Sequence, residues 1–192
     1  MSYKVVLASG SPRRHQLLLQ AGIAHTVQVT DADETASGTP EHVVQELARR
    51  KAMAVQGLEN NTIIIAADTL VFAGGNVLGK PANADEAFEM LNALQGATHE
   101  VYTGVTIVCG GVQHVFFEVT AVTFRQVCGD EMRAYIATGE PFDKAGGYGI
   151  QGRAGAFVTA IDGDFYNVVG LPIARVCQVL AQLGFLHWQQ LP

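Results

Sequence analysis

A short polar turn, Ser9 to Arg14, contains residue types that bind phosphate. It follows the apolar run Tyr3 to Ala8, which is typical of a buried strand, while Ser11 and Pro12 predict a helix start. Free N–H groups at a helix start, the positive end of its dipole and two arginine side chains would together attract a phosphate group. The alternative interpretation is an ordinary helix cap followed by two solvated arginines.

A carboxylate, Asp68, comes directly after the apolar run Thr62 to Ala67. Ligands of α/β sheets bind beyond the carboxyl ends of the strands, so an aspartate there can hold a metal ion or activate water. An aspartate that merely begins a turn is the alternative. A separate acidic loop contains Asp33 and Glu34, which are typical of a solvated surface, although one of them could join Asp68 around a cation.

The segment Gly74 to Pro81 nearly matches a phosphate-binding P-loop. Pro81 stands where that motif needs a Ser or Thr hydroxyl for magnesium, and proline has no N–H to donate to a phosphate. We therefore reject a P-loop here, although Lys80 could still meet a phosphate as a point charge. Lys51 lies in a charge-rich predicted helix, and by itself its position favours a solvent-facing side chain.

A glycine-rich loop from Gly139 to Gly152 also contains aromatic, apolar and charged residues. Many glycines permit the backbone to approach a ligand closely, and loops frequently contain binding residues. A merely flexible loop is the alternative, but such loops seldom combine Tyr, Ile, Phe and an adjacent Asp-Lys pair. This pattern favours a ligand-binding loop.

Composition limits the class of protein. The chain has 192 residues, 48% hydrophobic and 16% charged, which is typical of a globular protein with a substantial core. The net charge of −6 disfavours binding to long nucleic acids. Three scattered cysteines without a CxxC pair indicate reduced thiols, and no apolar stretch reaches the length of a membrane span, so we expect a cytoplasmic protein. The six histidines show no metal-ligand spacing.

The elements that must position these residues alternate between strand and helix patterns, which predicts a single α/β domain over residues 1–192. Gly110-Gly111 predicts a two-residue hairpin turn and therefore a mixed sheet. The aromatic core candidates are Phe116, Phe117, Phe124 and Phe157. The predicted strands cover 3–8, 62–67, 101–109 and 112–124, and the predicted helices begin at Pro12, Pro40, Asn83, Asp130 and Pro172 and end near Gly22, Gly57, Gly96, Thr138 and Gly184.

These motifs, in this order, resemble the Maf family of nucleotide pyrophosphatases. The resemblance covers residues 7–172 and depends on LASGSPRR (7–14), AADT (66–69), LGKP (78–81), TGV (103–105), GEPFDKAGGYGIQG (139–152) and NVVGLP (167–172). It implies an α/β fold with a mixed twisted sheet and flanking helices, similar to inosine-triphosphate pyrophosphatases, with two lobes around a cleft. It also implies a divalent cation, Mg²⁺ or Mn²⁺, and a homodimer.

The resemblance assigns roles by motif position. Asp68 matches the family's proton acceptor, and Glu34 with Asp68 matches its metal-side acids. The specificity positions are Arg13, Thr69 and Gln151. The positions expected to face the phosphates are Ser9, Arg14, Lys51, Lys80 and Lys144.

The expected reaction is hydrolysis of dTTP, UTP and modified pyrimidine triphosphates to the monophosphate and pyrophosphate. Hydrolysis of the modified substrates would remove non-standard nucleotides. A second branch of the family prefers 7-methyl-GTP and has Gln and Glu where this chain has Thr69 and Gln151. An amide can donate to and accept from a pyrimidine edge, whereas guanine N–H donors suit a carboxylate, so Gln151 favours the pyrimidine branch. A nucleotide-binding regulator of cell division, acting in septum formation, is the alternative from another class.

Overall fold

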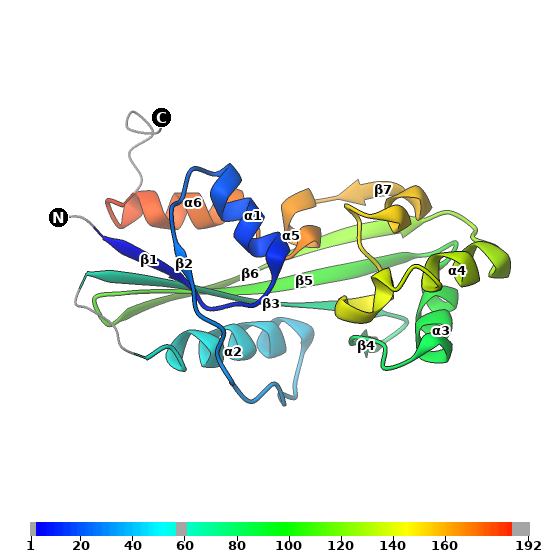
Figure 1. Cartoon of the computed structure of the whole chain (residues 1–192), viewed down its shortest axis with the longest axis horizontal. Helices are drawn as coiled ribbons and strands as arrows, with labels where there is room; N and C mark the ends of the chain where they lie inside the picture. Colours follow the sequence, from blue (N-terminus) through cyan, green and yellow to red (C-terminus); the bar gives the residue numbers. More distant parts are fainter. Residues whose placement is uncertain (1–2, 57–60, 186–192) are drawn as a thin grey trace. The chain divides into compact units, whose positions relative to one another are not determined.

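The computed structural model describes residues 3–56 and 61–185. The chain divides into two compact units, and strands β3, β5 and β6 contribute residues to both (Figure 1). Unit 1 comprises Met1–Asp68, Thr103–Glu118 and Gly170–Pro192, and unit 2 comprises Thr69–Tyr102 and Val119–Val169.

The elements alternate along the chain as an α/β fold requires. The strands are β1 (Lys4–Leu7), β2 (Thr26–Val27), β3 (Thr62–Ala73), β4 (Asn76–Leu78), β5 (Thr98–Cys109), β6 (Val112–Phe124) and β7 (Val158–Asp162). The α-helices are α1 (Pro12–Gln20), α2 (Pro40–Met53), α3 (Ala84–Leu94), α4 (Gly129–Ile136), α5 (Phe165–Val169) and α6 (Ile173–Gln182). Three 3₁₀ helices follow α4: η1 (Glu140–Asp143), η2 (Ala145–Gly147) and η3 (Arg153–Phe157).

The sheet is mixed, as the hairpin predicts. Its strands pair in the order β2-β1-β3-β5-β6-β7, and β4 pairs with β3. β1 runs parallel to β2 and β3, whereas β3 with β4 and β6 with β7 are antiparallel. The predicted turn is present: Gly110 and Gly111 link β5 to β6 with φ of 55° and 80°, a conformation that glycine adopts without strain.

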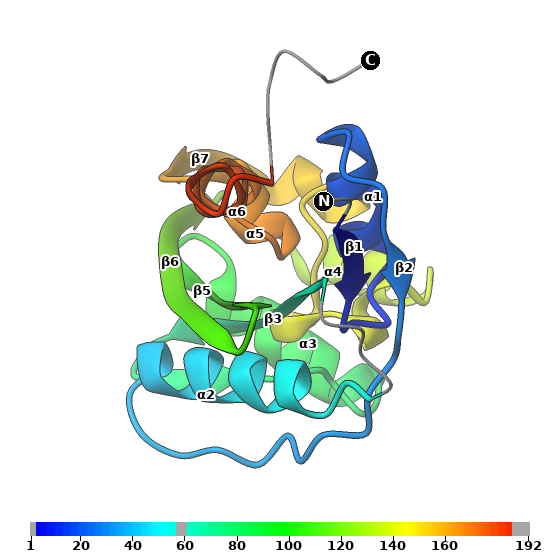
Figure 2. The ribbon, with the colours of Figure 1, turned by 90° about the vertical axis from the view of Figure 1, so that its left-hand side faces the viewer.

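Unit 1 has helices on both faces of its strands: α2 covers one face, and α1 and α6 cover the other (Figure 2). The β1 run packs into this core, where Leu7, Ile63 and Ile65 are completely buried. Gly104 of β5 permits the close approach of α2, because a Cβ there would lie 2.3 Å from the carbonyl carbon and oxygen of Val44. The glycine of the TGV motif therefore lets α2 pack closely against β5.

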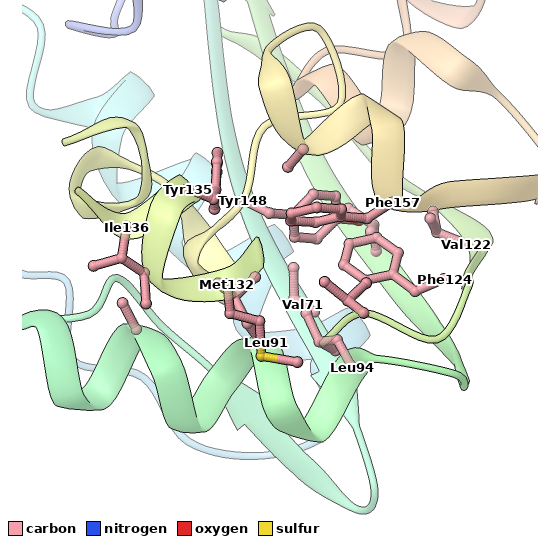
Figure 3. Packing of buried hydrophobic residues seen from close by; sticks show 14 residues of the cluster. Val71, Leu91, Leu94, Val122, Phe124, Met132, Tyr135, Ile136, Tyr148 and Phe157 are labelled. Atoms are coloured by element: carbon pink, nitrogen blue, oxygen red, sulfur yellow. The ribbon is translucent and has the colours of Figure 1, made fainter. Parts of the chain in front are cut away.

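Unit 2 has its own core, built from β3, α3, the last residues of β6, α4 and the glycine-rich loop (Figure 3). Phe124, Tyr148 and Phe157 meet edge to face, with ring centroids 4.8 Å apart for Phe124 and Tyr148. Such pairs are favourable beyond the area that they bury. Of the four predicted core aromatics, Phe116, Phe124 and Phe157 are buried, whereas Phe117 is only partly buried.

The helix starts follow local sequence signals, with two differences in detail. Asn83 caps α3 by accepting from the Glu86 N–H at 2.9 Å, and the Glu86 carboxylate accepts from the Ala82 N–H at 2.8 Å and from the Asn83 side-chain amide at 3.3 Å. Ser11 occupies the N-cap of α1, yet its side chain makes no capping bond; its N–H donates to the Ser9 hydroxyl.

The prediction that Asp68 follows the end of a strand is wrong. β3 continues to Ala73, so Asp68 lies inside it. β1 pairs with residues 62–65 and β4 with residues 71–73, and β5 is the other neighbour of β3 in the sheet, so β3 has pairing partners beyond its apolar run. Pairing partners decide strand length more than local polarity does. Helix α2 also ends at Met53, earlier than predicted, and Gly57 lies outside the described residues.

Short elements were not predicted from the sequence. β2 has two residues and β4 three, while β7 is mostly exposed and α5 spans one turn. None of them has the alternating or helical apolar pattern that a sequence reading needs. Within the described ranges, no helix is long and apolar enough to cross a membrane.

Candidate functional site

The register of β1 against β3 brings the polar turn to the level of Asp68. Leu7 pairs with Ile65, and the Ala8 N–H donates to the Ile65 carbonyl at 2.8 Å. Because the two strands are parallel, the turn that begins at Ser9 lies beside the part of β3 that follows Ile65. Two motifs about sixty positions apart in the sequence therefore meet within unit 1.

An ion-paired cluster surrounds Asp68. The Lys51 ammonium donates to Asp68 Oδ1 at 2.6 Å and forms a second ion pair with Glu34 Oε1 at 2.8 Å. The side chains of Lys51 and Asp68 are mostly buried, with 14% and 16% exposure, whereas Glu34 is 62% exposed. The solvent-facing position that the sequence favours for Lys51 is therefore wrong, because its charge is used to pair two carboxylates. Three of the predicted site residues are thus in direct contact.

Arg14 joins the Ser9 turn to the NVVGLP motif. Its Nε donates to the Gly170 carbonyl at 2.8 Å, and a terminal nitrogen donates to Ser9 Oγ at 3.1 Å. Burial lowers the pKa of Arg14, while the negative charge of Asp68 opposes this shift. Arginine nevertheless stays charged in proteins, so a partly buried positive charge acts on Asp68. The alternative of two solvated arginines is wrong for Arg14.

Arg13 lies beside this cluster on the first turn of α1. It is partly buried, and its positive charge is close enough to lower the pKa of Arg14 further. Two like charges held together at a helix start leave that region strongly positive. This is the electrostatic character that an anionic ligand requires.

The acidic loop is held against α2 by a second arginine. Arg50 donates to the Thr35 carbonyl at 2.7 Å and to Asp33 Oδ2 at 3.3 Å, while Asp33 Oδ1 accepts from the Thr35 N–H. Neighbouring residues of one helix thus hold this loop, with Arg50 bonded to Asp33 and Lys51 to Glu34. The sequence reading missed Arg50; its place beside Lys51 was the only signal.

In unit 2, the glycine-rich loop is ordered by side-chain hydrogen bonds, so the flexible-loop alternative is wrong. The Tyr135 hydroxyl donates to Glu140 Oε1 at 3.1 Å and accepts from the Gly149 N–H at 3.3 Å. Burial raises the pKa of Tyr135, and the Glu140 carboxylate raises it further, so the phenol keeps its proton. The Arg153 N–H donates to Glu140 Oε2 at 3.2 Å.

Lys80 and Lys144 belong to segments that meet in unit 2. The Gly146 N–H donates to the Gly79 carbonyl at 2.9 Å, which joins the GGYG and LGKP motifs. The Lys144 ammonium donates to the Glu140 carbonyl at 2.6 Å and pairs with Asp143, whereas the Lys80 side chain is exposed. The predicted phosphate positions of unit 2 therefore occupy adjoining backbone segments.

Gln151 projects from a fixed turn. The Gly152 N–H donates to the Gly149 carbonyl at 3.0 Å, and Gln151 itself is exposed. A Cβ on Gly152 would lie 2.0 Å from Glu140 Oε1, so a larger residue there would displace the carboxylate that bonds Tyr135 and Arg153. Thr69, the other specificity position in unit 2, is partly buried in β3. A side chain on a rigid support can recognise a ligand without first being ordered.

Sequence reasoning missed two further supports of these motifs. His99, buried in β5, makes a 2.8 Å hydrogen bond to the Tyr148 hydroxyl of the glycine-rich loop. Asn167 is completely buried and donates to the Val101 carbonyl at 2.9 Å and to Thr120 Oγ1 at 3.0 Å. The position of Asn167 at the start of NVVGLP was a signal, whereas nothing local marks His99.

A mixed sheet with partly buried arginine, lysine and aspartate side chains beside the end of β1 defines an α/β protein suited to an anionic ligand. The family comparison agrees with that class. The chain belongs to the family described as Maf-like protein, whose model matches residues 4–183.

Three relatives that are similar over nearly their whole length are each named dTTP/UTP pyrophosphatase. The chain is 49% identical over 189 residues to a dTTP/UTP pyrophosphatase of Lachnoclostridium phytofermentans, covering 95% of this chain and 96% of that protein. It is 49% identical over 181 residues to a dTTP/UTP pyrophosphatase of Bacillus cereus, covering 93% and 95%. It is 48% identical over 184 residues to one of Symbiobacterium thermophilum, covering 95% of both chains.

Proposed function

We propose that this protein hydrolyses dTTP and UTP to the nucleoside monophosphate and pyrophosphate. The observation that carries the proposal is the cluster in which Lys51 contacts both Asp68 and Glu34, beside the partly buried Arg14. It combines a carboxylate that can take a proton with positive charges that suit phosphate. The names of relatives that are 48–49% identical over more than nine-tenths of the chain support the substrate.

In this mechanism, Asp68 orients the attacking water and accepts its proton. Water attacks the α-phosphorus, the bond to the bridging oxygen breaks, and pyrophosphate leaves with the bonding electrons. Negative charge develops on that leaving group, so positive side chains that bind it stabilise the transition state. The proposal assigns this role to Arg14 and Lys51, with Ser9 as a hydrogen-bond donor, and extends it to Lys80 and Lys144.

The residues present fit a divalent cation that binds together with phosphate. Among residues 3–56 and 61–185, no group of three or more His, Cys, Asp or Glu side chains is arranged to hold a metal. Mg²⁺ at nucleotide sites commonly takes one or two carboxylates and completes its shell with phosphates and water. Glu34 and Asp68 would hold it, and its charge would polarise the phosphate oxygens when bound.

The proposed base preference depends on Gln151, with Arg13 and Thr69 as the other specificity positions. A glutamine amide can donate to a pyrimidine carbonyl and accept from its ring N–H, and the fixed turn holds Gln151 ready for this contact. The cytoplasmic location and the homodimer stay predictions of the sequence.

A substrate panel tests the proposal. Purified protein is assayed for pyrophosphate release from dTTP, UTP, 7-methyl-GTP and the standard purine and cytidine triphosphates, with Mg²⁺, with Mn²⁺ and with excess EDTA. We expect the highest kcat/KM for dTTP and UTP, and loss of turnover in EDTA. A higher kcat/KM for 7-methyl-GTP would assign the chain to the other branch, and absence of turnover with every triphosphate would refute the enzymatic role.

A further inference from the structure

Lys51 contacts the two carboxylates that the proposed function assigns to the cation. Its ammonium lies 2.6 Å from Asp68 Oδ1 and 2.8 Å from Glu34 Oε1. A divalent cation that used these oxygens as ligands would have to approach them within about 2.0–2.1 Å. An ammonium group and a cation cannot share the same oxygens at such distances without strong repulsion.

The charges around the carboxylates are already balanced. Lys51 supplies one positive charge by direct contact, and the charges of Asp68 and Glu34 both act on the nearby Arg14 guanidinium. Cation affinity of oxygen sites depends strongly on how much negative charge the ligands present. A free divalent cation therefore meets a nearly neutral pair of acids.

We propose that Lys51 is an internal counter-ion that disfavours binding of a free divalent cation at Glu34 and Asp68, so that the cation enters together with the triphosphate. The inference depends on the proposed function. A triphosphate brings several negative charges, which give Lys51 another partner and offer the cation additional oxygen ligands. Lys51 thus makes the metal–nucleotide complex, and not the free nucleotide or the free metal, the species that this protein selects.

The position of Lys51 supports a displaceable contact. It lies in the last turn of α2, and its long, flexible stem can move the ammonium while the helix stays in place. Its partner Glu34 is largely exposed and lies in a loop that Arg50 anchors independently through Thr35 and Asp33. Movement of Lys51 would therefore leave the carboxylates in position to bind the cation.

The test measures Mn²⁺ binding to metal-free protein by electron paramagnetic resonance, without nucleotide. Lys51→Met removes the charge and keeps an unbranched apolar stem of similar length. Arg49→Met is the matched control, because Arg49 lies on the same helix and pairs only with Glu46 in the ion pairs of the described residues. We expect Lys51→Met to bind Mn²⁺ on the order of tenfold more tightly than wild type, and Arg49→Met to stay within about twofold.

Two results would overturn the proposal at this stage. Unchanged or weaker Mn²⁺ binding by Lys51→Met would show that Lys51 does not oppose the cation. An equal gain in Mn²⁺ affinity for Arg49→Met would show that the effect comes from the net charge of the protein and not from the position of Lys51. Thermal unfolding of both variants checks that they are folded. If Lys51→Met fails to fold, Lys51→Gln serves the same comparison.

A second titration adds a non-hydrolysable UTP analogue with an imido group between the α and β phosphates. Wild type should then bind Mn²⁺ much more tightly, and the difference from Lys51→Met should shrink, because coupling between two ligands is reciprocal. If the analogue tightens Mn²⁺ binding and the difference between wild type and Lys51→Met nevertheless stays unchanged, joint entry is refuted. If the proposed substrate is wrong, the analogue has no effect on any variant, while the comparison with Mn²⁺ alone still decides whether Lys51 opposes the cation.

Discussion

At the scale of single residues, the contact between Lys51 and Asp68 determines what unit 1 can do. The two side chains come from different elements, α2 and β3, and both are mostly buried. Burying one charge alone is costly, and the ion pair between the two side chains offsets that cost. A carboxylate kept in this way can act as a base or as a cation ligand.

We predict that Asp68→Asn abolishes turnover of dTTP and UTP but leaves triphosphate binding largely intact. An amide still accepts hydrogen bonds but cannot take a proton at neutral pH, and loss of a general base costs roughly 10²–10⁴ in kcat. The control is Asp33→Asn, because Asp33 is exposed and pairs with Arg50. A kcat of Asp68→Asn within about tenfold of wild type would assign the base role to another group.

Gln151 is the residue to which the proposed function assigns the choice between a pyrimidine and a 7-methylguanine base. We predict that Gln151→Glu, alone or with Thr69→Gln, lowers kcat/KM for dTTP and UTP by about ten- to a hundredfold and shifts relative preference toward 7-methyl-GTP. Glutamate loses the amide donor and brings a charge close to the pyrimidine carbonyls. The exposed Gln178→Glu on α6 is the control. Equal losses for all three substrates would mean that Gln151 only supports its loop.

At the scale of elements, the separation between α2 and β5 depends on one missing side chain. We predict that Gly104→Ala destabilises the protein by about 1–3 kcal/mol, because overpacking against a backbone forces elements apart. The obstacle is rigid, since the atoms nearest to a new Cβ belong to the backbone of Val44 and Gln45. Gly79→Ala should be nearly neutral, because nothing lies within 4 Å of its Cβ position.

Urea unfolding of the two glycine variants measures this difference. A midpoint for Gly104→Ala equal to that of wild type would show that α2 can shift away from β5 without cost. If Gly79→Ala loses as much stability, the effect belongs to glycine substitution in general and not to this contact.

At the scale of the whole molecule, a buried histidine makes stability depend on pH. Burial lowers the pKa of His99 from 6.5 to about 4 in the folded protein. Between pH 6.5 and 4, His99 is therefore protonated in the unfolded chain but neutral in the folded protein. The free energy of unfolding decreases as pH falls through that window. The full loss is about 3 kcal/mol, since each pKa unit corresponds to about 1.4 kcal/mol.

The prediction concerns the slope of stability against pH. His99→Gln cannot take up a proton but can still hydrogen-bond the Tyr148 hydroxyl, so its melting temperature should fall less than that of wild type between pH 6.5 and 4. Calorimetry at half-unit intervals compares the two proteins. Parallel curves would show that His99 does not contribute to acid sensitivity.

Elements with strong local signals could be predicted from the sequence. The apolar run before Ser9 predicts β1, Asn83 with Glu86 predicts the start of α3, and Gly110-Gly111 predicts the β5–β6 hairpin; the structure confirms all three. Each signal acts through backbone geometry or capping within a few residues, so it needs no distant partner. The chemistry of the site residues was equally readable, because side-chain type alone decides what can donate, accept or bear charge.

Only the tertiary structure decided how those residues are used. The continuation of β3 through Asp68 depends on neighbouring strands of the sheet, and the burial of Lys51 depends on a carboxylate seventeen positions away. Arg14 contacts Gly170 across 156 positions, and Tyr135 orders the glycine-rich loop through Glu140 and Gly149. Hydrogen bonds and ion pairs of this kind form between groups that the fold brings within about 3 Å of each other. No local pattern encodes them, because their energy depends on distance in space and not on separation along the chain.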